Sequence, residues 1–134
     1  MGTTAAERSR IIQLQCVLKD YAFSFLMHAF SNDDQPGVIQ KAMDGMPKIA
    51  NFLGNQNYLT GDKVTMPDFI LFEVVETILG LCHDRRLFQA HPNLEGFYTR
   101  IRALPTFAAY LNSPRHLAEP FFIPAAKVNM QMPQ

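Results

Sequence analysis

Apolar positions in residues 4–30 recur at intervals of three and four, which is the spacing of one face of a helix. No Gly or Pro interrupts this stretch. Thr4 and Glu7 have the spacing of a capping box, in which each side chain bonds the backbone N–H of the other residue. We therefore predict one long helix, whose core face carries Ile11, Leu14, Leu18, Tyr21, Phe25 and Ala29.

A second apolar stripe lies beside this core face. It comprises Ile12, Cys16, Phe23, Leu26 and Phe30. Together the two stripes make the helix apolar over more than half of its circumference, so it needs cover on two sides. We expect its own domain to cover one side and something else to cover the other.

Four more helices are predicted, over residues 38–53, 66–81, 90–104 and 105–113, because apolar residues keep the helical spacing there. Pro47 interrupts the first of them, so the sequence leaves two interpretations open, a bend at that point or a weak first half of the helix. No segment alternates as a strand does. From Pro114 onward the chain is too rich in proline for regular structure. The fold class predicted is all-α, a bundle of about five helices followed by an irregular Pro-rich C-terminal tail that folds back over them.

The third predicted helix has a carefully specified start. In "TGDK", Gly61 and Asp62 suit a chain reversal. In "TMPD", Thr65 is a suitable N-cap and Asp68 can return a bond to the Thr65 amide, while Pro67 falls in the first turn. The spacing predicts a capping box, and a well-made helix start is a sufficient explanation for it.

Composition excludes several classes of partner. The length of 134 residues predicts a single domain, residues 1–134. Twelve basic and twelve acidic residues cancel, which argues against a nucleic-acid partner. No apolar run is long enough for membrane insertion, and the first residues lack the pattern of a signal peptide. The simplest interpretation is a soluble intracellular protein, cytoplasmic, with an organelle left open.

Cysteine and histidine spacing gives no reactive site. Cys16 and Cys82 form no CxxC pair, which favours buried, reduced thiols over a disulfide or a zinc site. The triplet "CHD" at 82–84 has triad residue types, but consecutive side chains on a helix point in different directions. The four histidines lack the spacing of metal ligands. We predict neither a metal site nor a catalytic residue.

Two longer segments carry a family resemblance. "FLGNQNYLTGDKVTMPDFILFEVV" and "HPNLEGFYTRIRALPTFAAYLNSPRHLAEPFF" resemble the C-terminal helical domain of cytosolic glutathione transferases, with the mu class as the closest in pattern. The resemblance covers nearly the whole chain, and its most specific parts are "GDKVTMPDF", "PNLEGF" and "AYLNSPR". It implies the same helical fold, and a capping box at Thr65 and Asp68 that serves folding rather than chemistry.

The resemblance also implies site residues. Phe23 and Phe30, with Phe122 and Ile123 in the tail, correspond to positions that line an apolar site for electrophiles. Asp20 corresponds to an acid that reaches across a dimer toward glutathione. Periodicity alone leaves an alternative open, in which the four apolar residues are ordinary core and Asp20 is a solvated surface acid.

Departures from the family pattern remove polar chemistry. Phe30 replaces a tyrosine and Ala22 replaces a common arginine. Only six residues precede Glu7, so we expect the N-terminal thioredoxin-like domain, which binds glutathione and carries the catalytic Tyr or Ser, to be absent. No cofactor is expected, except glutathione if a thioredoxin-like half is supplied.

Two functions follow as hypotheses. The first is a non-catalytic structural or protein-interaction module within a larger assembly, with a protein partner or a second copy of the chain. The alternative is one half of a split or truncated mu-like glutathione transferase, providing the electrophile site and dimer contacts. In either case the isolated chain should self-associate, because an apolar patch is left uncovered.

Overall fold

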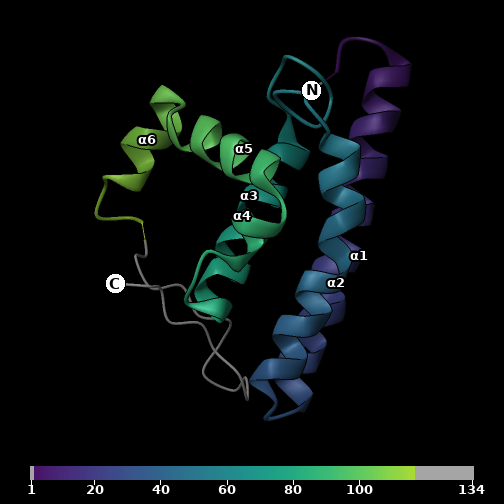
Figure 1. Cartoon of the computed structure of the whole chain (residues 1–134). Coiled ribbons are helices and arrows are strands. Elements are labelled where there is room, and N and C mark those ends of the chain that lie inside the picture. The colour runs from purple at the N-terminus through teal and green to yellow at the C-terminus, as the bar shows by residue number, and fades with distance from the viewer. Residues whose placement is uncertain (1, 117–134) are drawn as a thin grey trace.

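The computed structural model describes residues 2–116, and these residues form six helices (Figure 1). Within that range the only extended pairing is an isolated bridge between Tyr58 and Gly61. The predicted all-α class is confirmed. The helices are α1 (Ala5–Ser31), α2 (Gln35–Leu53), α3 (Met66–Cys82), α4 (Arg86–Ala90), α5 (Pro92–Arg102) and α6 (Pro105–Leu111).

Helix α3 is the centre of the bundle. The long helices α1 and α2 run antiparallel beside each other, and α3 packs against both of them (Figure 1). On its other side α3 contacts α4 and α5, and α6 follows α5 at the edge of the fold (Figure 1). Most of α3 is buried, including Leu71, Phe72, Val75 and Ile78. A helix that is apolar around most of its circumference is stable only in such a covered position.

The core follows the predicted periodicity in most places. On α1 the buried residues are Ile11, Leu18, Phe25 and Ala29. On α5 they are Leu94, Phe97 and Ile101. Helical spacing over residues 38–53 predicts that Phe52 is buried with Ala42, Met46 and Leu53. Phe52 is instead exposed, and the guanidinium carbon of Arg10 lies 5.1 Å from the centre of its ring. This one inward assignment on α2 was wrong, because Phe52 lies on the flank of α2 that faces solvent.

The helix ends explain why the elements start where they do. The predicted capping box at Thr4 is present: Glu7 N donates to Thr4 Oγ1 at 3.1 Å, and Thr4 N donates to Glu7 Oε2 at 3.1 Å. Helix α2 begins at Gln35, earlier than predicted, because Asp34 Oδ1 accepts the Gly37 N–H at 3.1 Å. This helix continues through Pro47.

Helix α4 was missed by the sequence reasoning. It has only five residues, too few for apolar periodicity to show. Leu87 and Phe88 are nevertheless buried, so this short helix positions the start of α5 against α3. The predicted fourth helix therefore begins at Pro92 rather than at Ala90, and the last helix ends at Leu111 rather than at Ser113.

Candidate functional site

The start of α3 is held by a buried carboxylate. Asp68 is 0% exposed. Its Oδ2 accepts the Thr65 N–H at 2.7 Å and the Thr65 hydroxyl at 3.2 Å. Its Oδ1 accepts the Leu59 N–H at 2.8 Å, so the same carboxylate also ties down the preceding loop. The Asp68 N–H donates to the Thr65 carbonyl oxygen at 3.0 Å.

The electrostatics of Asp68 follow from this burial. Removal from water raises the pKa of the Asp68 carboxyl above its usual range, while the bonds from Leu59 and Thr65 act in the opposite direction. The groups that bond the Asp68 carboxylate are two backbone amides and one hydroxyl, and none of them is titratable in the ordinary pH range. The arrangement can order the helix start, and it offers no group for acid–base chemistry on an outside molecule.

Phe23 lies on the outer flank of α1 and is 60% exposed. It lines an open groove of about 340 Å³ between α1 and α3, so the core alternative is wrong for this residue. The other apolar side chains of the groove are Ala22, Phe25, Leu26, Ile70 and Val74. Lys19, Glu73 and Thr77 supply its polar edge.

The remaining predicted site residues are not all brought together. Phe30 is partly buried near the end of α1, two helical turns beyond Phe23, and is not among the residues that line the groove. Asp20 is exposed on α1. Phe122 and Ile123 lie outside the described residues. The structure therefore places Phe23 in a groove and Asp20 nearby on the same helix. The predicted site roles of Phe23, Phe30, Asp20 and the two tail residues all stay predictions.

The outer stripe of α1, which we define as Ile12, Cys16, Phe23 and Met27, faces away from the core. Ile12 is 53% exposed and Met27 is 44% exposed. Cys16 is exposed as well, so the prediction that it is buried was wrong. The reason is its place on the flank opposite Leu18 and Phe25. Cys82 is buried, and both cysteines are free thiols.

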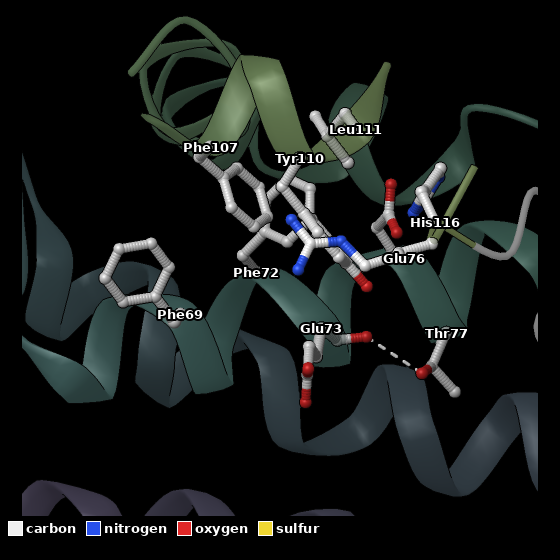
Figure 2. Close-up of a pocket in the computed structure, with 10 residues that line it drawn as sticks. Phe69, Phe72, Glu73, Glu76, Thr77, Phe107, Tyr110, Leu111 and His116 are labelled. Atoms are coloured by element: carbon white, nitrogen blue, oxygen red, sulfur yellow. Dashed lines mark hydrogen bonds between the residues drawn. The ribbon is translucent and has the colours of Figure 1, made fainter. Parts of the chain in front are cut away.

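A second cavity, of about 360 Å³, lies between α3 and α6 (Figure 2). This cavity was not predicted from the sequence, although Phe107, Tyr110 and Leu111 have the three-and-four spacing of one helical face. Beside it, Glu76 Oε1 accepts the Tyr98 hydroxyl at 2.9 Å and Arg102 Nη1 at 3.2 Å. Burial, together with the adjacent Glu76 carboxylate, raises the pKa of Tyr98 to about 12.

Among residues 2–116, no group of three or more His, Cys, Asp or Glu side chains is arranged to hold a metal ion. None of the helices in the same range combines the length and the apolar character needed to cross a membrane.

Comparison with known proteins gives relatives over most of the chain. Glutathione S-transferase Mu 1 of Oryctolagus cuniculus is 29% identical over 133 residues, covering 93% of this chain and 58% of the relative. Glutathione S-transferase Mu 7 of Rattus norvegicus is 30% identical over 124 residues, covering 90% of this chain and 56% of the relative. The chain thus spans somewhat more than half the length of the curated relatives it matches.

A solved structure supports the same fold. The rat hPGDS complexed with a quinoline superposes with a TM-score of 0.68 at 20% identity, covering 86% of this chain and 61% of that one. The family model described as "Glutathione S-transferase, C-terminal domain" matches residues 20–114. With its central capped helix and its mu-class relatives, this chain belongs to the glutathione S-transferase C-terminal domain family.

Proposed function

We propose that this chain is a non-catalytic structural or protein-interaction module within a larger assembly. The observation that carries this proposal is the exposed outer stripe of α1. Phe23 alone leaves 60% of its surface in solvent, and Ile12 and Met27 extend the apolar surface along the same helix. Apolar and aromatic side chains gathered on one exposed face favour contact with another protein.

The partner in this proposal is another protein or a second copy of the chain. A nucleic-acid partner is disfavoured because the chain carries no net charge. No glutathione chemistry is assigned to the helical domain itself, since the family binds glutathione through the thioredoxin-like half. This proposal therefore assigns no catalytic residue, and Thr65 and Asp68 serve folding.

The experiment is a pull-down of the chain from its native source, with a glutathione column run on the same material. The variant Ile12→Gln/Phe23→Gln/Met27→Gln removes the three large apolar side chains of the outer stripe, and Val64→Gln is a control at an exposed apolar residue outside α1. The module proposal is supported if the wild-type chain is recovered in an assembly, the triple variant is not, and the material is not retained on the glutathione column. Equal recovery of the wild type and the triple variant counts against it.

A second candidate is one half of a mu-like glutathione transferase. The groove between α1 and α3 favours it, because Phe23 lines an apolar wall there and the relatives are longer than this chain. In this case Phe23, Phe30, Phe122 and Ile123 would contact the electrophile, and Asp20 would contact glutathione across a dimer. Glutathione would bind only with a thioredoxin-like half supplied.

The same pull-down separates the two candidates. A thioredoxin-like polypeptide that co-purifies, together with retention on the glutathione column, identifies the transferase half. In that case Asp20→Asn should weaken retention, and Asp33→Asn, an exposed acid in the α1–α2 turn, should leave it unchanged.

A further inference from the structure

A groove that the proposed function does not use lies between α1 and α2, the two antiparallel helices of Figure 1. Its volume is about 310 Å³. The apolar residues that line it are Leu14, Val17, Leu18, Ile49, Phe52 and Leu59. Leu18 and Leu59 are buried in the core, whereas Val17 is 55% exposed. The groove therefore has a fixed apolar floor and apolar walls that solvent reaches.

The groove is short and closed at one end. Along α1 it extends from Arg10 to Val17, which is about 10 Å at the helical rise. One turn beyond Val17, the Tyr21 hydroxyl donates to the Ala42 carbonyl oxygen on α2, so this side chain fills the gap between the two helices. A hollow of this size, mostly apolar with a few polar groups, is typical of a site for a small molecule.

The charged side chains that line the groove are all basic. They are Arg10 on α1 and Lys48 on α2, and the amide of Gln13 is the other polar group. The guanidinium carbon of Arg10 lies 5.1 Å from the centre of the Phe52 ring, and this contact holds the charge at the rim. Among residues 2–116, neither Arg10 nor Lys48 forms an ion pair with an acid.

The acids one helical turn away bond other groups. Glu7 lies three residues before Arg10, and its Oε2 accepts the Thr3 N–H at 2.6 Å. Asp44 lies four residues before Lys48, and its Oδ1 accepts the Gln40 side-chain amide at 2.6 Å. Neither carboxylate lines the groove. The positive charge at the rim is thus available to a ligand.

We propose that this groove binds a small amphipathic organic anion, whose apolar chain lies along the groove and whose carboxylate meets Arg10 and Lys48. Hydrogen bonds from a guanidinium or ammonium group to a carboxylate are stronger than neutral ones. A ligand with a positive head would face two like charges, and a neutral ligand would gain only apolar burial. The Gln13 amide can donate a further bond to the same carboxylate. This site is separate from the outer stripe of α1, so the inference goes beyond the proposed function.

The experiment titrates the full chain with octanoate, octan-1-ol and octylammonium, which share one alkyl chain and carry a negative, a neutral and a positive head. The NMR signals of Val17, Ile49 and Phe52 report the binding. Octanoate should bind saturably, and added salt should weaken it. Octan-1-ol should bind about fourfold or more weakly, since two exposed charge partners each contribute about two- to fivefold, and octylammonium more weakly still.

Two results would overturn the proposal. If octanoate and octylammonium bind equally, the groove recognises apolar shape and not charge. If octanoate does not saturate these signals, the groove holds no such anion.

Three variants locate the binding. Arg10→Gln/Lys48→Gln should remove the preference for octanoate over octan-1-ol, while continued binding of octan-1-ol shows that the groove is intact. Val17→Gln should weaken both probes. Lys41→Gln removes the same charge from an exposed position of α2 outside the groove and should change nothing. A preference that persists in the double variant refutes the site. The test uses the purified chain without a partner, so its result is separate from that of the pull-down.

Discussion

Asp68 Oδ1 accepts the backbone N–H of Leu59 at 2.8 Å, nine residues earlier in the chain. One carboxylate thus closes the loop that follows α2 and also starts the central helix. The Leu59 side chain is buried in the core. Its backbone N–H therefore needs an acceptor within the protein, and Asp68 supplies it.

Asp68→Ala should lower the free energy of unfolding by about 2 to 4 kcal/mol, because it leaves the buried Leu59 amide and the partly buried Thr65 amide without an acceptor. Urea unfolding followed by circular dichroism measures the change. Thr65→Ala, which removes only a hydroxyl, should cost less, about 0.5 to 2 kcal/mol. Asp62→Asn in the neighbouring loop is the control, and a loss as large as that of Asp68→Ala would remove the special role of the buried acid.

The Asp68 carboxyl also makes the free energy of unfolding depend on pH. Burial raises the pKa of Asp68 in the folded chain, so as pH falls the folded state takes up this proton before the unfolded state does. The contribution of Asp68 to stability is therefore largest below its unfolded pKa and decreases as pH rises through its folded pKa. The difference in unfolding free energy between wild type and Asp68→Asn should be larger at pH 4 than at pH 7. A smaller difference at pH 4 than at pH 7 would mean that the hydrogen bonds to Asp68 affect its pKa more than burial does.

Removing the outer stripe of α1 should change association but not folding. The purified wild-type chain should self-associate and bind an apolar-surface dye, because Phe23, Ile12 and Met27 are exposed. The triple Gln variant should do less of both, while its free energy of unfolding changes by about 0.5 kcal/mol or less per site. Sedimentation and urea unfolding give the two quantities. A wild-type chain that is a clean monomer without dye binding contradicts this expectation.

Two aromatic residues on neighbouring helices should respond very differently to truncation. Phe97 on α5 is fully buried, so Phe97→Ala should cost about 3 to 5 kcal/mol through the cavity that it leaves. Tyr110 on α6 is exposed, so Tyr110→Ala should cost about 1 kcal/mol or less. Thermal unfolding of both variants tests the contrast, and equal losses would mean that α6 is as integral to the core as α5.

Residues close in sequence made much of this fold predictable. The helices around Leu18, Ala42 and Val75 follow from spacing, and their caps follow from residue types at fixed offsets. Helix α4 could not be found, because a single turn has no period to detect. The burial of Leu87 and Phe88 is decided by α3 and α5, which lie elsewhere in the chain.

The site was less predictable than the fold. Periodicity places Phe23 and Cys16 on an apolar stripe, but whether that stripe is covered depends on what packs against α1. Within residues 2–116 it is left in solvent. The aromatic cavity likewise depends on the angle at which α6 meets α3, and no local pattern encodes that angle. Tertiary arrangement, rather than local propensity, decided both features.

Helix α6 contains no fully buried residue, whereas α3 is covered along most of its length. Backbone amides exchange with solvent deuterium through the least costly opening that frees them. Those of α6 should therefore exchange through a local opening, and those at the centre of α3 only when the whole domain unfolds. The amides of α6 should thus be weakly protected from exchange and those of α3 strongly protected. The aromatic cavity between the two helices therefore has one wall that opens readily and one wall that does not.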